Sequence, residues 1–150
     1  MQIRHAQKSD EAELARLLEE MEHHYGNVAP AGAAAAGAAM LVTPPPSGML
    51  CLVAEETMGR LSGFAILIPY FPAAHLSHGL FLKELYITAA ARSSGLGKTL
   101  IEAIRKLAQK RGDTRVIWTT GTANSGAQRF YDRLGIRREG KVYYVMDGWA

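Results

Sequence analysis

The stretch RSSGLGKT, residues 92–99, has the residue types of a phosphate-binding loop. A Walker-type nucleotide loop would need a glycine at position 92, where the chain has Arg92. A dinucleotide-binding fingerprint would need a third glycine at position 100, where the chain has Leu100. Both patterns fail at one position. What remains is Arg-x-x-Gly-x-Gly, which opens a helix directly after an apolar strand, and the free N–H groups of a helix start favour an anion.

Two further side chains could move protons. Glu84 interrupts the apolar run LFLKELYI, residues 80–87, and Tyr131 lies in ANSGAQRFYDRLGI, residues 123–136. An amine of the lysine type has a pKa of about 10.4 and must lose a proton before it can attack, and a carboxylate can accept that proton. A tyrosine hydroxyl can donate or accept a hydrogen bond. The structural alternatives are a strand residue reaching solvent for Glu84 and packing beside Phe130 for Tyr131.

The elements that must position these groups follow from hydrophobic periodicity and turn residues. We predict, in chain order, a strand at 2–6, a helix from Ser9 or Asp10 to Tyr25, a hairpin at 49–71 turning at Thr57–Gly59, a strand at 80–87, a helix from Leu96 to Gly112, a strand at 115–120, a helix from Asn124 to Gly135 and a strand at 141–148. Glu13 stands at capping-box distance from the first helix start. Residues 26–48, rich in Ala, Gly and Pro, are predicted to be a mobile segment with one helical piece.

Length and composition predict one domain, residues 1–150, with 48% hydrophobic and 21% charged residues. The single cysteine, Cys51, lies in an apolar run, which indicates a core residue and a reducing, cytoplasmic compartment. No apolar run is long enough to span a membrane. The net charge of +3 is mildly basic, and neither interleaved aromatic residues nor a recognisable module points to nucleic acid.

The order of elements and the two motifs resemble the GNAT superfamily of acyl-CoA-dependent N-acetyltransferases. Residues 92–97 match its Arg/Gln-x-x-Gly-x-Gly/Ala signature. Residues 124–136 look like its Asn-…-Ala-…-Phe-Tyr-…-Leu-Gly-Phe segment, with Ile136 for the usual Phe. The resemblance implies an α/β (α+β) fold with a central mixed, mostly antiparallel twisted sheet of about six to seven strands flanked by helices, in the order β-α-(α)-β-β-β-α-β-α-β.

The resemblance also implies which residues hold acetyl-CoA, the acyl donor. Backbone N–H groups from Ser93 to Lys98 would hold the pyrophosphate, the end of the strand at 80–87 would pair with the pantetheine arm like an added strand, and Asn124, which can also cap its helix, would contact the same arm. The full expected set is Leu85, Tyr86, Ile87, Arg92, Ser93, Ser94, Gly95, Leu96, Gly97, Lys98, Asn124, Ala127 and Phe130. Tyr131 resembles the family's general acid, and Glu84 is the expected base.

For the acceptor, the sequence looks most like the polyamine and thialysine (diamine) acetyltransferase branch. That branch has two adjacent acids in the fourth strand, whereas this chain has Lys83 before Glu84. Because a lysine repels a polycation, a primary amine that carries its own carboxylate, such as an amino acid, fits this strand better. The residues expected to line the acceptor site are His24, Tyr25, Lys83 and Glu84.

We therefore predict an acetyl-CoA-dependent N-acetyltransferase for a small-molecule primary amine (diamine, polyamine or amino-acid-like), acting by direct attack in a ternary complex. The alternatives are acetylation of a protein lysine or N-terminus and a non-catalytic acyl-CoA-binding sensor, which would need neither Glu84 nor Tyr131. No metal is expected, because His75 and His78 have no acid or cysteine beside them in sequence. Neither a nucleic-acid nor a membrane partner is expected, and a homodimer follows from the resemblance alone.

Overall fold

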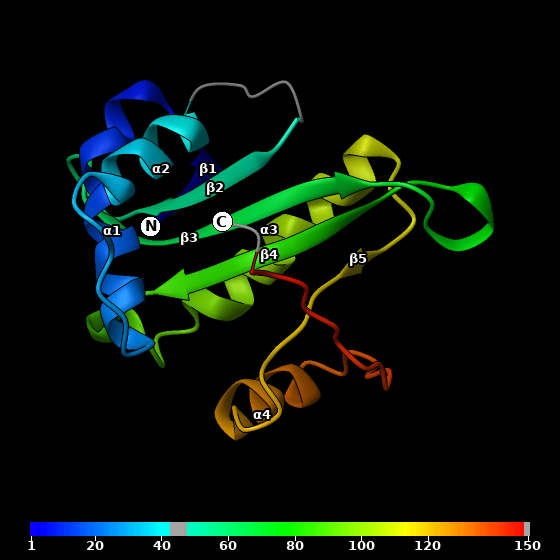
Figure 1. The fold of residues 1–150 in the computed structure, drawn as a ribbon. Helices are drawn as coiled ribbons and strands as arrows, with labels where there is room; N and C mark the ends of the chain where they lie inside the picture. Colours follow the sequence, from blue (N-terminus) through cyan, green and yellow to red (C-terminus); the bar gives the residue numbers. More distant parts are fainter. Residues whose placement is uncertain (43–47, 149–150) are drawn as a thin grey trace. The chain divides into compact units, whose positions relative to one another are not determined.

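The structure, a computed structural model, describes residues 1–42 and 48–148 (Figure 1). The chain forms two compact units, which we call the sheet unit, residues 1–119, and the C-terminal unit, residues 120–150. The strands of the sheet unit are β1 (Gln2–His5), β2 (Leu50–Glu55), β3 (Leu61–Tyr70), β4 (Gly79–Ile87) and β5 (Val116–Ile117). Its helices are α1 (Glu11–His24), α2 (Ala33–Val42) and α3 (Leu96–Arg111). The C-terminal unit contains α4 (Ser125–Arg133).

The five strands form one sheet in the order β1-β2-β3-β4-β5. The first four pair antiparallel and β5 pairs parallel to β4, so the predicted mixed, mostly antiparallel sheet is confirmed. The hairpin between β2 and β3 turns where it was predicted, because the Arg60 N–H donates to the Thr57 carbonyl at 3.1 Å. Met58 and Gly59 both have positive φ there, which is the conformation that a tight hairpin turn requires.

The predicted strand count of six to seven is wrong within the part of the chain that the structure describes. Of residues 115–120, only Val116 and Ile117 pair with β4, and residues 141–148 are not in a strand. The sequence of residues 141–148 has the β-branched and aromatic residues that strands favour, but a strand exists only beside a hydrogen-bonded neighbour. Local sequence pattern carries no information about that neighbour.

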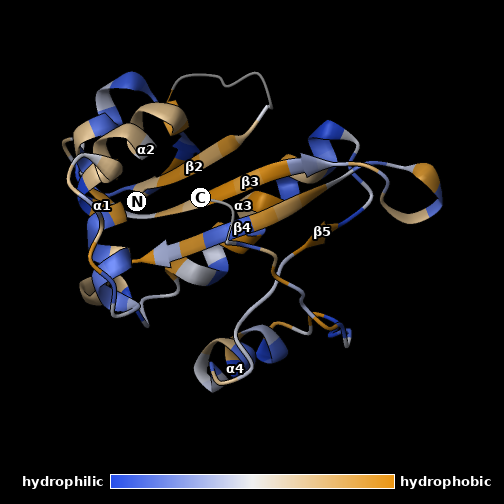
Figure 2. Cartoon of the chain, viewed as in Figure 1, coloured by the Kyte–Doolittle hydropathy of each residue, from blue (hydrophilic) through white to orange (hydrophobic). Residues whose placement is uncertain are grey.

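The sheet buries both of its faces. On one face, α1 and α2 pack against β2, β3 and β4 through a core that contains Leu14, Leu17, Met21, Ala38, Cys51, Val53, Leu61, Phe64 and Tyr86. On the other face, α3 passes behind β3 and β4 (Figure 1), and Leu96 and Leu100 pack with Ala54 and Ala91. Hydrophobic residues accordingly follow β2, β3 and β4 (Figure 2). Burial raises the pKa of Cys51 to about 12, and the prediction that Cys51 is a core residue is confirmed.

The first helix is tied to the sheet by hydrogen bonds between the Glu13 and Arg16 side chains and the backbone of Leu61. Glu13 does not cap the helix as predicted, because its carboxylate accepts from the Leu61 N–H at 2.9 Å and from Arg16 at 2.8 Å instead. These bonds, with the Arg16 guanidinium first, hold the pKa of Glu13 down to about 2. In the segment at 26–48, the predicted helical piece is α2, and residues 43–47 lie outside the described residues.

Candidate active site

The strand β4 contains an irregularity at its two charged residues. Leu67 of β3 pairs with Leu82 and the adjacent Ile66 pairs with Glu84, so Lys83 is an extra residue in β4. Such bulges bend a strand and redirect its side chains, and they are common beside active sites. Lys83 Nζ lies 3.7 Å from Glu84 Oε1, and the side chains are 55% and 30% exposed. The predicted base is therefore reachable from solvent and has a cation next to it.

Beyond this bulge, β4 forms the edge of the sheet. The parallel strand β5 pairs only with Leu80 and Phe81, so the part of β4 from Leu82 to Ile87 has no outer strand partner among the described residues. An unpaired edge offers backbone donors and acceptors to an extended ligand. The residues predicted to meet the pantetheine arm, Leu85 to Ile87, lie on this edge.

The glycine-containing stretch connects β4 to α3. Ser93 and Gly95 have positive φ values of 64° and 88°, and Gly95 is the residue that precedes α3. Within the described residues, the backbone N–H groups from Ser93 to Lys98 have no acceptor, and the first helical bond runs from the Thr99 N–H to Gly95 at 3.1 Å. A Cβ added at Gly95 would meet no atom within 4 Å. Free donors at a helix start with open space above them suit a pyrophosphate.

Residues of the stretch differ in what they can offer a ligand. The side chain of Leu96 is buried in the core under α3, so only its backbone can take part. The side chain of Arg92 turns toward β4, where its Nε donates to the Ile87 carbonyl at 3.1 Å. The Arg92 Cζ atom lies 5.7 Å from the centre of the Tyr86 ring, a cation–π distance.

Sequence reasoning missed Glu20, which holds the Tyr86 ring in place. Tyr86 is 3% exposed, and its hydroxyl donates to the Glu20 carboxylate at 2.9 Å. Burial raises the pKa of Tyr86 to about 12, and the Glu20 hydrogen bond acts in the same direction. The one available signal was position, because Glu20 follows Leu17 by three residues and so borders the core side of α1.

The end of α1 reaches the same place. The His24 ring lies 6.2 Å from the Tyr86 ring and 5.3 Å from the Tyr25 ring. The pKa of Tyr25 is raised first by burial and then by the charge of Glu84, while Arg92 opposes the shift. Of the residues predicted to line the acceptor site, His24 is thus next to the Tyr25 and Tyr86 rings, and the charge of Glu84 reaches Tyr25. Lys83 lies beside Glu84 on the bulge.

The C-terminal unit carries the remaining predicted residues. Asn124 caps α4, since its Oδ1 accepts from the Ala127 N–H at 3.1 Å, which confirms the capping alternative for this residue. The rings of Phe130 and Tyr131 lie 5.2 Å apart in a tilted arrangement. Capping leaves the amide nitrogen of Asn124 available to a ligand.

Two other places contain histidines that are not among the predicted site residues. His78 has no acid beside it in sequence, but the fold brings Asp113, from the connection after α3, to 2.6 Å from its Nδ1 atom. The described residues contain no group of three or more His, Cys, Asp or Glu that could hold a metal ion.

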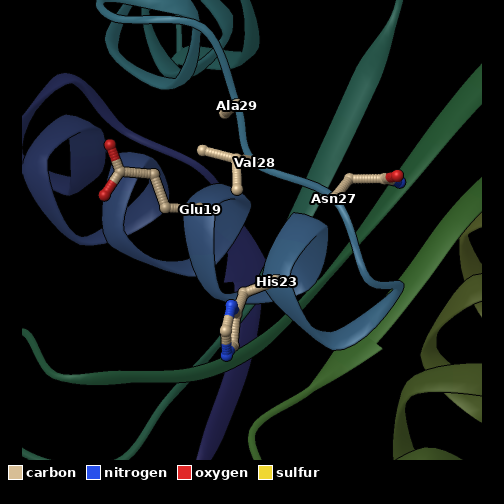
Figure 3. A pocket seen from close by; sticks show the side chains of 5 residues that line it. All are labelled: Glu19, His23, Asn27, Val28 and Ala29. Carbon is tan, nitrogen blue, oxygen red and sulfur yellow. The ribbon is translucent and has the colours of Figure 1, made fainter.

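An open pocket of about 260 Å³ is lined by Glu19, His23, Asn27, Val28 and Ala29 (Figure 3). It contains none of the predicted site residues.

A free strand edge followed by a helix start with unpaired N–H groups is an arrangement that suits an extended, phosphate-bearing ligand. Residues 9–136 match the profile of the acetyltransferase (GNAT) family. The chain belongs to this family, so the resemblance noted from the sequence is confirmed. No helix among the described residues has both the length and the apolar character needed to cross a membrane.

Individual relatives are more distant. A D-amino-acid N-acetyltransferase of Saccharomyces cerevisiae is 30% identical over 98 residues, which cover 65% of this chain and 60% of that protein. A thialysine N-epsilon-acetyltransferase of Caenorhabditis elegans is 28% identical over 107 residues, covering 69% and 64%. The chain thus covers less than two thirds of either relative. The structure of an integron cassette protein from the mobile metagenome of V. cholerae superposes with a TM-score of 0.87 at 27% identity, covering 99% of this chain and 93% of that one.

Proposed function

We propose that the chain transfers an acetyl group from acetyl-CoA to the primary amine of a small molecule by direct attack in a ternary complex. The observation that carries this proposal is the run of acceptor-free N–H groups from Ser93 to Lys98, directly after the unpaired edge of β4. The loop would hold the coenzyme pyrophosphate and the edge would hold the pantetheine arm. Bound acetyl-CoA supplies the acetyl group as a thioester.

The proton transfers are assigned to two residues. Glu84, part-exposed on the bulge of β4, would accept a proton from the acceptor ammonium, directly or through water, because only the neutral amine can attack. Tyr131 would donate a proton to the departing thiolate. A backbone N–H near Leu85 or Tyr86 would polarise the thioester carbonyl. In the C-terminal unit, Asn124, Ala127 and Phe130 complete the proposed coenzyme set.

The proposal treats residues 1–150 as one catalytic domain. The family match at residues 9–136 includes residues 9–119 of the sheet unit and residues 120–136 of the C-terminal unit, which supports it. A cytoplasmic location is supported by the single, buried cysteine, which leaves no internal disulfide to form. A homodimer is proposed from the family resemblance.

The acceptor is proposed to be amino-acid-like. Lys83 would repel a polyamine, and a relative named for D-amino acids supports a substrate that carries a carboxylate. A site that binds both the amine and the carboxylate of its acceptor would also favour a free amino acid over a lysine within a protein, because the latter has no free α-carboxylate.

The test is thiol release from acetyl-CoA over a panel of amines: diamines, polyamines, free amino acids and a lysine-containing peptide. We expect turnover on at least one small amine, and we expect Tyr131→Phe to lower kcat far more than it weakens acetyl-CoA binding, because the hydroxyl acts in the chemical step. Coenzyme binding without turnover on any amine would contradict the proposal and indicate an acyl-CoA sensor. Turnover on the peptide alone would indicate a protein acetyltransferase.

A further inference from the structure

We propose that Arg92 binds the carboxylate of the acceptor and that Glu84 receives its amine, so that the acceptor is an amino acid. This inference rests on the proposed function and gives Arg92 a different role from the coenzyme contact predicted by family resemblance. Its basis is the direction of the Arg92 side chain, which leaves the donor-rich loop and lies over Tyr86. Tyr86 belongs to the core under α1, on the face of the sheet opposite α3.

The guanidinium of Arg92 is held in a fixed place by a rigid support. The ring under it is buried, its hydroxyl is bonded to Glu20, and Glu20 is in turn bonded to Arg16 at 3.0 Å. The Arg92 Nε bond to the Ile87 carbonyl fixes the other side of the guanidinium. The guanidinium also acts on the Tyr86 hydroxyl through a side-chain hydrogen bond, but no carboxylate of the described residues forms a salt bridge with it, so it can take the carboxylate of a ligand.

The opposite charge lies at a suitable distance on the same face. Glu84 and Tyr86 are two residues apart in β4, so both side chains point toward α1, about 6.6 Å apart along the strand. An amino acid lying along β4 would place its ammonium at Glu84 and its carboxylate over Tyr86, at Arg92. His24 and Tyr25 border the same space from the end of α1. The pKa of Tyr25 responds to both Glu84 and Arg92, which is consistent with this arrangement.

A matched pair of acceptors isolates the contribution of the carboxylate. We would compare kcat/KM for lysine and cadaverine, and for alanine and ethylamine, in the wild type and in Arg92→Gln. Glutamine occurs at this position in the family signature, so the variant removes the charge while keeping a residue that the loop tolerates. A charge-assisted bond to a carboxylate predicts that the preference for the amino acid over its decarboxylated counterpart falls by about tenfold to a hundredfold.

Two further variants and one binding measurement complete the test. Arg105→Gln removes an exposed arginine of α3 and should leave the preference unchanged. A loss of preference in Lys83→Gln but not in Arg92→Gln would overturn the assignment in favour of Lys83. An equal loss for both acceptors in Arg92→Gln, together with weaker acetyl-CoA binding by titration, would make Arg92 a coenzyme residue and leave the proposed function standing. A wild type that binds acetyl-CoA and acetylates no amine would contradict the proposed function itself.

Discussion

The side chains on the two faces of β4 make different kinds of contact. On the side of α3, Leu85 and Ile87 pack against an apolar core that contains Leu100. On the side of α1, Tyr86 also lies in an apolar core, but its hydroxyl joins a chain of charged and hydrogen-bonded groups that runs through Glu20 to Arg16. Glu84, on the same side, is part-exposed beside Lys83. Because successive residues of a strand point to opposite faces, one short segment can support both environments.

The difference indicates that the two sides of β4 serve different ligands. The apolar side fixes α3, and the start of α3 presents the N–H groups proposed to hold the coenzyme. The polar side holds charged groups in defined positions, which suits a small polar acceptor. The bulge at Lys83 lies where the strand changes from a paired inner strand to an open edge. Acceptor and coenzyme would thus meet across the edge of β4.

The largest expected effect comes from the apolar side. Leu100 is fully buried, and Leu100→Ala would leave a cavity under α3, lowering the free energy of unfolding by about 2–5 kcal/mol. Lys106→Ala on the exposed side of the same helix should change it by less than about 0.5 kcal/mol. Urea unfolding followed by circular dichroism measures both. Equal effects of the two variants would show that the α3 face is not the packed side of the strand.

A smaller effect, dependent on pH, is expected from the polar side. The pKa of Glu13 is lowered to about 2, chiefly by the Arg16 guanidinium, so its contribution is present above the ordinary pKa and is lost as pH falls from about 4.5 toward 2. Glu13→Gln should therefore reduce stability at pH 7 by on the order of 1–3 kcal/mol and converge with the wild type near pH 2. Glu102→Gln, an exposed change on α3, is the matched control. If Glu13→Gln leaves the free energy of unfolding unchanged between pH 2 and pH 7, Glu13 does not contribute to stability through its bond to Arg16.

The sequence was sufficient for elements with strong periodicity and clear ends. The helix α3 has Leu96, Leu100 and Ile104 at helical spacing, and Gly112, with a φ of 81°, ends it as predicted. The glycine-containing stretch before α3 could be located for a related reason, because Gly95, with a φ of 88°, is a local sequence feature that marks the turn into the helix. Separate motifs in the expected order made the family recognisable.

Features that depend on distant partners could not be predicted. The contact of His78 needs Asp113, and the hydrogen bond of Tyr86 needs Glu20, which is 66 positions away in sequence. The lack of pairing at residues 141–148 depends on a neighbouring strand. The Arg92 side chain lies over the Tyr86 ring and not over the loop. This direction depends on the tertiary structure, so a match to the loop motif could not predict it.

The most direct test of the two-sided site is an amide chemical-shift titration of the full chain, with coenzyme A first and an amino acid second. Coenzyme A should shift the amides from Ser93 to Lys98 and those at the edge of β4, and the amino acid should then shift Tyr25, Glu84 and the Arg92 side chain. Coenzyme A that leaves residues 93–98 unshifted while it binds elsewhere would contradict the account.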